Sequence, residues 1–163
     1  MTMAEQRRGR RISMTAEERD DFLGAARTCR VATSSPSGPH VSPLWFLWHD
    51  GAIWLYSIVS SKRFQDLQAD SRIAVVVDDG HDFGELRGVE LTGRARVVGE
   101  VPRTGALSVP ELVPVEAGYA AKYQGRETLR YDARHAWLVV DVDKIVSWDF
   151  RKIEGGAPRA GQG

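Results

Sequence analysis

The chain contains one unbroken hairpin sequence, His40-Val-Ser-Pro-Leu-Trp-Phe-Leu-Trp-His-Asp-Gly-Ala-Ile-Trp-Leu-Tyr-Ser-Ile58. Asp50-Gly51 is a strong turn signal, because both residues tolerate the positive φ that a tight hairpin needs. We therefore expect antiparallel strands over His40–His49 and Ala52–Ile58. Pro43 has no N–H to donate, so the backbone is expected to leave the ladder there. The freed carbonyls and amides are then available to a planar ligand.

Further strands are expected on both sides of this hairpin. Apolar runs and alternation predict strands at Arg30–Ser34, Arg72–Val77, Val89–Val97, Ala136–Val142 and Ile145–Phe150. Gly93 marks a bend in the longest of them. About seven strands joined by tight turns favour antiparallel pairing, and closure into a barrel would remove the sheet edges. The predicted fold class is mainly β, an antiparallel barrel with short helices.

Three short helices are expected beside the sheet. Thr15 and Glu18 have the spacing of a capping box and open the first helix. The second helix is expected from Ser61 to about Ala69. The third is expected around Val115–Tyr123 and is closed by Gly125.

Length and composition set the class of protein. The 163 residues fit one domain, and 22 basic residues balance 22 acidic ones, so the charge surplus of a non-specific nucleic-acid binder is missing. One cysteine, Cys29, excludes an intrachain disulfide framework. The apolar runs are too short to span a bilayer, and the charged start does not resemble a secretory signal. We expect no nucleic-acid or membrane partner and a cytoplasmic location.

The two ends of the chain differ from the predicted barrel domain at 13–152. Residues 1–12 form a polar arm with Arg7, Arg8, Arg10 and Arg11. A flexible, frayed terminus is the favoured interpretation, and a basic arm that reaches an acidic ligand is the alternative. Residues 153–163 are expected to form a flexible, glycine-rich tail.

Standard catalytic motifs are not present in the sequence. No G-x-G-x-x-G joins a strand to a helix, and neither a Walker A motif nor a G-x-S-x-G elbow occurs. The four histidines show no metal-ligand spacing. We therefore predict no metal site and name no catalytic side chain.

The most informative segment for function runs from Ser57 to Leu67. A strand ends and a helix begins at Ser60-Ser61, and Lys62 and Arg63 occupy the first helical turn. The helix dipole disfavours cations there, and an anion would reverse the sign. Backbone N–H groups, serine hydroxyls and two cations would form a phosphate site. The equally weighted alternative is a solvated helix face on which the two cations pair with Asp66.

Aromatic residues suggest two further contacts. Trp45 and Phe46 point to opposite faces of their strand, so one of them lies outside the barrel core and suits a planar heterocycle. A core or interface residue is the commoner role of a single tryptophan. Trp148 and Arg151 follow the last strand and could cover a ligand bound to a neighbouring subunit. Plain packing is the favoured role for Trp148.

Four segments together resemble a known superfamily. They are Arg30-Val-Ala-Thr33 with Gly38-Pro-His-Val-Ser-Pro-Leu-Trp-Phe46, Gly51-Ala-Ile-Trp-Leu-Tyr-Ser57, Ser61-Lys-Arg-x-x-x-Leu67 with Arg72-Ile-Ala-Val75, and Gly88-Val-Glu-Leu-Thr-Gly-Arg-Ala95. The chain resembles the pyridoxamine-phosphate-oxidase-like split β-barrel superfamily, also called the FMN-binding split barrel. The closer likeness is to its actinobacterial flavin/deazaflavin oxidoreductases of group B.

The resemblance implies a homodimer with two cofactor sites at the subunit interface. It implies F420 or, as the alternative, FMN as the cofactor, and a small organic molecule as the substrate. In the family the segment equivalent to Ser61, Lys62, Arg63 and Leu67 holds the cofactor phosphate, and Ser57 replaces a frequent threonine. Pro43, Leu44, Trp45 and Phe46 would run along the ring, and Trp148 would wall the substrate space. The residues implied to contact the ring or the substrate are thus Pro43, Leu44, Trp45, Phe46 and Trp148.

The chain departs from the oxidase pattern, because Gly88 stands where oxidase members carry a glutamine for FMN. The leading hypothesis is an F420-dependent reductase that transfers a hydride to an unknown acceptor. The alternatives are an FMN-dependent oxidoreductase of the same fold, a non-catalytic flavin or haem binder, and an interaction domain without a ligand.

Overall fold

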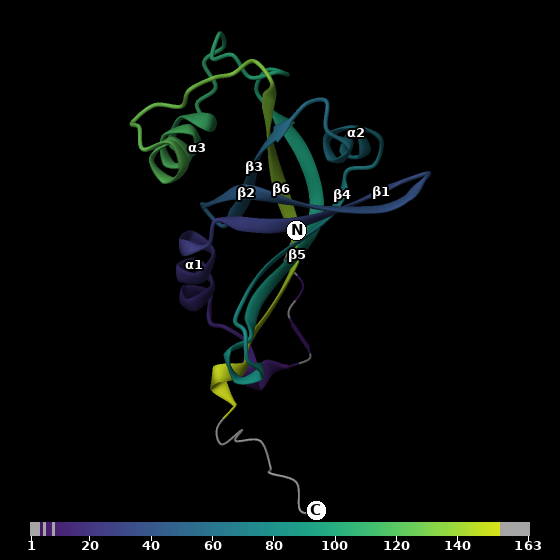
Figure 1. Ribbon diagram of the computed structural model, residues 1–163, viewed down its shortest axis with the longest axis vertical. Helices are drawn as coiled ribbons and strands as arrows, with labels where there is room; N and C mark the ends of the chain where they lie inside the picture. The colour runs from purple at the N-terminus through teal and green to yellow at the C-terminus, as the bar shows by residue number, and fades with distance from the viewer. Residues whose placement is uncertain (1–3, 5, 8, 154–163) are drawn as a thin grey trace, which may run out of the picture.

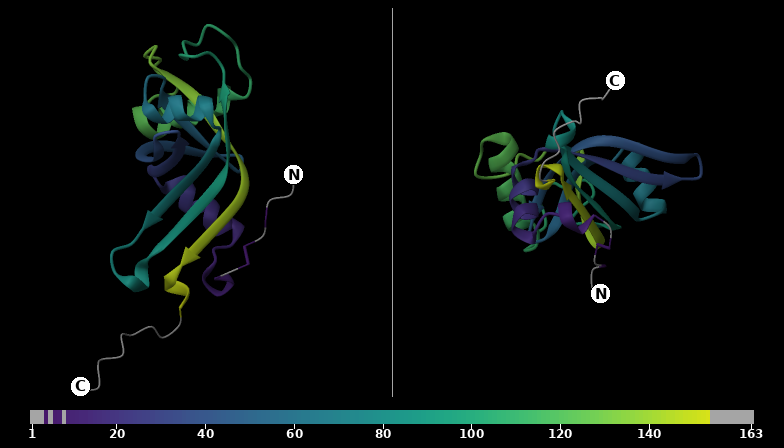
Figure 2. Two further views of the ribbon diagram at one scale, coloured as in Figure 1. Left: turned by 90° about the vertical axis from the view of Figure 1, so that its right-hand side faces the viewer. Right: turned by 90° about the horizontal axis from the view of Figure 1, so that it is seen from below.

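The computed structural model describes Ala4, Gln6, Arg7 and residues 9–153, and it forms a closed antiparallel barrel with helices around it (Figures 1 and 2). The strand order is β1-β2-β3-β6-β5-β4. The strands are β1 (Thr28–Ser35), β2 (Gly38–His49), β3 (Ala52–Ile58), β4 (Arg72–Asp79), β5 (Arg87–Val98) and β6 (His135–Asp149). The helices are α1 (Ala16–Ala25), α2 (Lys62–Ala69) and α3 (Leu112–Tyr119), with 3-10 turns at Arg10–Ile12, Phe83–Glu85 and Phe150–Lys152.

The barrel has six strands where the sequence analysis expects about seven. The two strands expected at the end of the chain are one strand, β6, which pairs with both β3 and β5. Gly93 pairs with Val142 and Thr92 pairs with Lys144, so Asp143 is an extra residue that bulges from the ladder. The bulge interrupts the alternation of buried residues, and for this reason the prediction of two strands was wrong. The predicted irregularity at Gly93 is confirmed.

Strand β2 is only partly paired on one of its two edges. Its ladder with β1 is continuous and includes the pair Arg30 and Pro43. Its ladder with β3 begins only at Phe46 and ends at His49. The backbone from Gly38 to Trp45 therefore has one edge without a neighbouring strand. The expectation that the backbone leaves the ladder at Pro43 was wrong, because the ladder with β1 continues through this residue and the ladder with β3 begins only at Phe46.

The helices begin and end for local reasons. Thr15 and Glu18 form the predicted capping box of α1. Helix α3 begins at Leu112, earlier than predicted, and Pro114 is tolerated because the first turn of a helix has no internal N–H partners. A π-helical turn at Ala120–Gln124 continues α3, and Gly125 closes it at φ 61°.

The apolar residues form two cores. One fills the barrel and includes Phe46, Leu55, Phe64 and Leu67. The other lies outside the barrel wall beneath α3, which Figure 1 shows beside β2 and β3. Its largest aromatic members are Trp54, Tyr56, Tyr119 and Trp137.

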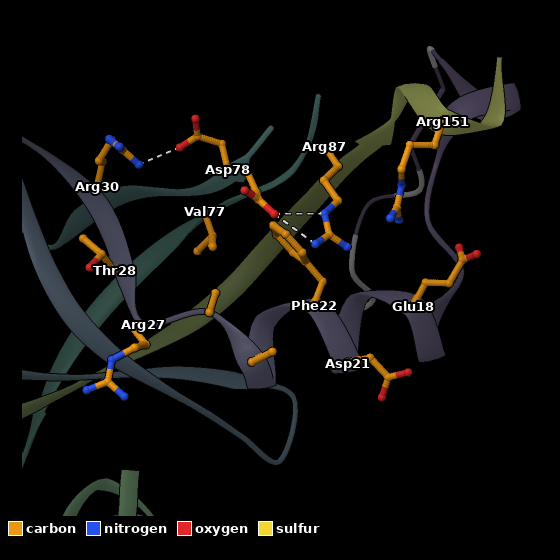
Figure 3. A pocket seen from close by; sticks show the side chains of 13 residues that line it. Glu18, Asp21, Phe22, Arg27, Thr28, Arg30, Val77, Asp78, Arg87 and Arg151 are labelled. Carbon is orange, nitrogen blue, oxygen red and sulfur yellow. Dashed lines mark hydrogen bonds and ion pairs between the residues drawn. The ribbon is translucent and has the colours of Figure 1, made fainter. Parts of the chain in front are cut away.

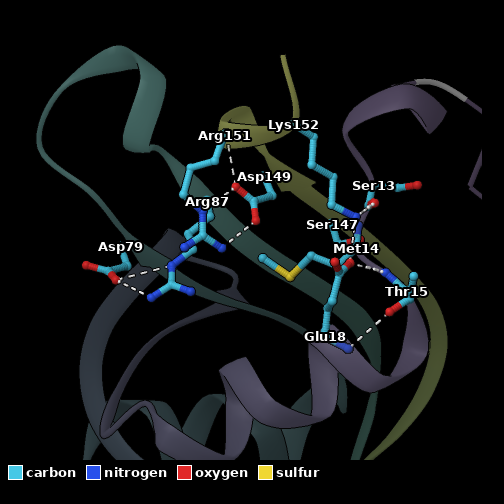
Figure 4. A network of polar contacts seen from close by, with 10 residues as sticks. All are labelled: Ser13, Met14, Thr15, Glu18, Asp79, Arg87, Ser147, Asp149, Arg151 and Lys152. Carbon is cyan, nitrogen blue, oxygen red and sulfur yellow. Dashed lines mark hydrogen bonds and ion pairs between the residues drawn. The ribbon is translucent and has the colours of Figure 1, made fainter. Parts of the chain in front are cut away.

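The described residues of the N-terminal arm lie against the barrel. Ala4 forms a parallel bridge with Lys144, and the Gln6 side chain hydrogen-bonds the backbone of Ser147 in both directions. Lys152 donates to the Ser13 carbonyl oxygen at 2.9 Å, at the end of the barrel seen in Figure 4. The arm is therefore docked at these points, where sequence alone favours a frayed terminus. Arg8 and residues 154–163 of the predicted tail lie outside the described residues.

No helix in this described part of the chain has the length and apolar composition that a membrane crossing requires.

Candidate functional site

The start of α2 has the polar composition that the sequence analysis singles out. Ser61 is the N-cap, and its hydroxyl accepts a hydrogen bond from the Phe64 N–H at 3.2 Å. Lys62 and Arg63 occupy the first turn as predicted, but their side chains take different directions. The two cations therefore lie in different environments.

Arg63 is a buried cation held by hydroxyl groups. Its residue is 7% exposed, its Nε donates to Ser57 Oγ at 3.3 Å, and its Nη1 donates to Ser42 Oγ at 2.5 Å. No carboxylate of a described residue pairs with it. A buried charge without a counter-ion is costly, and burial accordingly lowers the pKa of the guanidinium. An anion placed against Arg63 would remove this cost.

Lys62 already has an anionic partner. Its Nζ donates to Asp66 Oδ1 at 3.0 Å and to Ser35 Oγ at 3.2 Å, and its side chain is 47% exposed. Asp66 Oδ2 also accepts a hydrogen bond from the Thr33 hydroxyl at 2.9 Å. The hydrogen bond from Lys62, more than that from Thr33, lowers the pKa of the Asp66 carboxyl. The solvated-face alternative thus describes Lys62 and fails for Arg63.

The β2 residues of the predicted site divide between the two faces of the strand. Phe46 is fully buried in the barrel core, whereas Trp45 is 47% exposed, as their opposite directions predict. Pro43 is exposed and Leu44 is half-buried, and all three positions before Phe46 lie on the edge that β3 leaves open. Leu67 is buried in the barrel core, so its side chain anchors α2 and does not face a ligand.

Trp45 is held in place by Tyr123, from the segment that follows α3, and by Arg27, which precedes β1. The Tyr123 ring stacks on it with a centroid distance of 4.7 Å and an interplanar angle of 10°. The Tyr123 hydroxyl donates to the carbonyl oxygens of Arg27 and Phe46, at 2.7 and 2.6 Å. The Arg27 guanidinium lies 4.8 Å from the Tyr123 ring and 5.7 Å from the Trp45 ring. An exposed indole is thereby fixed beside an arginine that has no carboxylate partner among the described residues.

Trp148 lies near the opposite end of β6 from the residues of the α2 site. It faces Gly88 across the β5–β6 ladder, and a Cβ at position 88 would collide with its indole. The structure therefore does not join Trp148 to Arg63 within one chain. Arg151, which follows it, binds Asp149 through Nε at 2.8 Å and Nη2 at 2.6 Å, and Figure 4 shows this pair beside Arg87 and Asp79.

A groove of about 650 Å³ lies between α1 and the strands β1 and β4 (Figure 3). Its lining combines apolar side chains with four arginines and four acidic residues: Glu18, Asp21, Phe22, Ala25, Ala26, Arg27, Thr28, Arg30, Val77, Asp78, Asp79, Arg87 and Arg151. Arg30 pairs with Asp78 at 2.6 Å, and Arg87 pairs with Asp79 at 2.9 Å. These pairs neutralise two of the four arginines in the groove. The groove is adjacent to Trp45, because Thr28, which lines the groove, is the register partner of Trp45.

Ser42 and Tyr123 were not among the residues predicted for the site. Ser42 points to the same face of β2 as the buried Phe46. A polar residue at such an inward-facing position could have indicated a site residue. Tyr123 is far from Trp45 in sequence, and no local pattern indicates the stack. Cys29 is fully buried, and burial raises the pKa of its thiol to about 12, so it is unsuited to nucleophilic chemistry. Over the described residues, no group of His, Cys, Asp and Glu is arranged to hold a metal ion.

Comparison with known proteins gives one family. A family model described as pyridoxamine 5'-phosphate oxidase matches residues 15–149. No curated protein gives a significant sequence match.

Solved structures share the barrel. A conserved hypothetical protein from Mycobacterium tuberculosis is 29% identical, with 98% of both chains covered and a TM-score of 0.74. An FAD-binding protein from Mesorhizobium loti is 20% identical over 83% of this chain and 94% of its own, with a TM-score of 0.62. A protein described as an F420 reductase is 22% identical over 78% of this chain and 94% of its own, with a TM-score of 0.55. The last two likenesses concern the fold alone.

Proposed function

Because the chain belongs to the pyridoxamine 5'-phosphate oxidase family, we propose that it is an oxidoreductase that binds the deazaflavin F420, with FMN as the alternative cofactor. The observation that carries the proposal is the buried guanidinium of Arg63, which Ser42 and Ser57 hold and which no carboxylate of the described residues pairs with. A phosphoryl group is the natural counter-ion for such a donor set. The F420 reductase among the structures of the same fold supports the choice of cofactor.

The residues of the α2 site have distinct proposed roles. Arg63 neutralises the phosphate, and Ser57 and Ser42 fix the orientation of its guanidinium. Ser61 caps α2 by accepting the Phe64 N–H, and other N–H groups of the first turn would bind the phosphate. Lys62 contributes less, because Asp66 already satisfies its charge.

The ring is proposed to lie along the open edge of β2 from Pro43 to Phe46. Pro43 and Leu44 would contact it through the backbone, and the exposed Trp45 would contact it through the indole. When bound, the deazaflavin ring supplies a hydride to an electrophilic acceptor, and the protein supplies orientation and electrostatics. The buried Phe46 and Leu67 would support the site from the barrel core.

We also propose that the protein is a homodimer. Val41 is 67% exposed and Trp45 is 47% exposed on the outer face of β2, where a second copy would cover them. In such a dimer the partner's Trp148 would wall the substrate space. Size-exclusion chromatography with light scattering tests this: a dimer that Val41→Glu converts to monomer supports the interface, and a monomeric parent protein contradicts it.

Fluorescence titration of the purified protein with F420 and with FMN tests the cofactor. Saturable F420 binding, followed by turnover of reduced F420 with a panel of electrophilic acceptors, is the expected result. Preferential FMN binding would establish the alternative, and binding without turnover would indicate a non-catalytic carrier. A protein that binds neither ligand would contradict the proposal.

A further inference from the structure

Arg27 lines the groove between α1 and the strands β1 and β4, and its guanidinium is held there without a counter-ion (Figure 3). It lies 4.8 Å from the Tyr123 ring and 5.7 Å from the Trp45 ring, and its Nη1 donates to the Lys122 carbonyl oxygen at 3.2 Å. Within the described part of the chain, no carboxylate pairs with it. The two rings and the carbonyl orient the guanidinium but do not neutralise its charge, so Arg27 can bind an anion without losing an ion pair.

A second cation adds to the positive charge beside Arg27. Lys122 Nζ donates to the carbonyl oxygen of Gly24 at 3.0 Å and to that of Ala26, and it has no carboxylate partner among the residues described. Burial and, to a smaller extent, the charge of Arg27 lower the pKa of the Lys122 ammonium group. Two neighbouring cations disfavour each other's charged form, and an anion bound at Arg27 would relieve this repulsion.

The acidic residues that line the groove do not supply this anion. Three of them are paired with other cations: Asp78 with Arg30, Asp79 with Arg87, and Glu18 with Lys152. The fourth, Asp21, forms no ion pair with a described residue, and Figure 3 shows its carboxylate directed away from Arg27. The guanidinium of Arg27 is therefore available to a ligand that enters the groove.

The backbone beside Arg27 favours an anion with a single charge. Helix α1 ends at Ala25, so Arg27 lies just beyond its C-terminal end, where the helix dipole is negative. A doubly charged phosphate is favoured by the opposite arrangement, a helix N-terminus with free N–H groups. The planar fork of a guanidinium matches the two oxygens of a carboxylate. A carboxylate is therefore the anion that fits Arg27.

The groove provides space for a planar apolar group next to this carboxylate. It has a volume of about 650 Å³, and Phe22, Ala26 and Val77 form the apolar part of its lining. Sites for small molecules commonly combine such an apolar lining with a few polar groups that fix the orientation of the ligand. Thr28 also lines the groove and is the register partner of Trp45, so a molecule bound here lies beside that tryptophan.

We propose that the groove is a binding site for a planar conjugated carboxylic acid, whose carboxylate pairs with Arg27 and whose apolar body packs on Phe22 and Val77. Arg27 is then the residue that determines the specificity of the groove, and it is distinct from Arg63 of the α2 site. The position beside Trp45 places such a molecule where the acceptor of the proposed oxidoreductase would lie. That role rests on the proposed function, whereas the binding of the carboxylate does not.

Isothermal titration of the purified protein without cofactor tests the site, with trans-cinnamate as the probe and cinnamamide as its uncharged analogue. We expect saturable binding of trans-cinnamate and binding of cinnamamide that is about tenfold weaker or less. Arg27→Gln removes the charge of the side chain. It should raise the Kd of trans-cinnamate by about ten- to hundredfold and leave the Kd of cinnamamide unchanged.

The double variant Arg30→Gln with Asp78→Asn is the matched control. It removes an ion pair from the lining of the same groove without a change in net charge. The Kd of trans-cinnamate should therefore stay within about twofold of the parent value, since an exposed ion pair contributes little. Thermal unfolding by circular dichroism verifies that every variant is folded.

Three results would overturn the proposal. They are the same Kd of trans-cinnamate in the parent and in Arg27→Gln, equally tight binding of cinnamamide and trans-cinnamate by the parent, and tighter binding of phenyl phosphate than of trans-cinnamate. Absence of saturable trans-cinnamate binding would also contradict it. Titration with F420 and FMN separates this site from the proposed function: a protein that binds trans-cinnamate through Arg27 but neither cofactor would contradict the proposed function and support the carboxylate site.

Discussion

Gly88 lies directly across the β5–β6 ladder from Trp148, and the indole occupies the space where a side chain at position 88 would begin. The carbonyl oxygen of Val77 would also lie 2.9 Å from that Cβ, so backbone encloses the position as well. The Trp148 indole therefore occupies its position only because residue 88 has no side chain.

Gly88→Gln tests this close approach. The larger side chain must displace the indole, and overpacking of this kind costs about 1–3 kcal/mol of unfolding free energy. Urea denaturation measures the change. Gly84→Gln is the matched control, because a Cβ at Gly84 meets nothing within 4 Å. Equal stability of the two variants would contradict the packing argument.

Arg63→Leu tests the α2 site. Loss of the charge-assisted hydrogen bonds to a phosphate should cost about 1.5–3 kcal/mol, which is roughly a ten- to hundredfold rise in the Kd of F420 or FMN. The fold should persist, because removal of an unpaired buried charge is often tolerated. Lys62→Ala is the comparison and should raise the Kd less, since its ammonium group is already paired with Asp66. Isothermal titration of both variants decides the order, and the reverse order would refute the assignment to Arg63.

Asp66→Asn tests how the unfolding free energy depends on pH in the acidic range. The hydrogen bonds from Lys62 and Thr33 hold the pKa of Asp66 below its ordinary value of 3.8. The ionised carboxylate therefore stabilises the fold above that pH, and this contribution disappears as the pH falls through the lower folded pKa. Unfolding free energy measured from pH 6 downward, over roughly four pH units, should fall less steeply in the variant than in the parent. Parallel curves for the two proteins would show that the hydrogen bonds to the Asp66 carboxylate do not stabilise the fold.

Thr15→Ala tests the capping box of α1. The substitution removes the hydroxyl that accepts the Glu18 N–H at 3.1 Å and should destabilise the protein by about 1 kcal/mol. Thr128→Ala is the control, because Thr128 is exposed and has no hydrogen bond through its side chain among the described residues. Thermal melts of the two variants provide the measurement. A control as destabilising as Thr15→Ala would remove the capping explanation.

Local signals were sufficient for most of the fold. Asp50-Gly51 predicts the hairpin of β2 and β3, and the spacing of Thr15 and Glu18 predicts the start of α1; both are confirmed. The bulge at Asp143 was not predictable in this way, because a single extra residue mimics the end of one strand and the start of another. The alternation of buried residues on the two sides of the bulge can be recognised only from the pairing of β6 with β3 and β5.

The candidate site was predictable only where neighbours in sequence are neighbours in space. The first turn of α2 contains its cations at the expected positions, but burial separates Arg63 from Lys62, and burial depends on β2 and β3. Ser42 on β2 contacts Arg63 on α2, and Tyr123 contacts Trp45 from a different part of the chain. Contacts of this range come from topology and have no local sequence pattern.

The π-helical turn at Ala120–Gln124 makes the length of this segment critical. This turn contains one residue more than a regular helical turn. Its Lys122 donates to the carbonyl oxygens of Gly24 and Ala26, and its Tyr123 stacks on Trp45. Deleting a single residue here would relax the backbone into ordinary helix and rotate the following side chains by about 100°. Homologues that keep Trp45 stacked should therefore tolerate substitution within this turn far better than a gap.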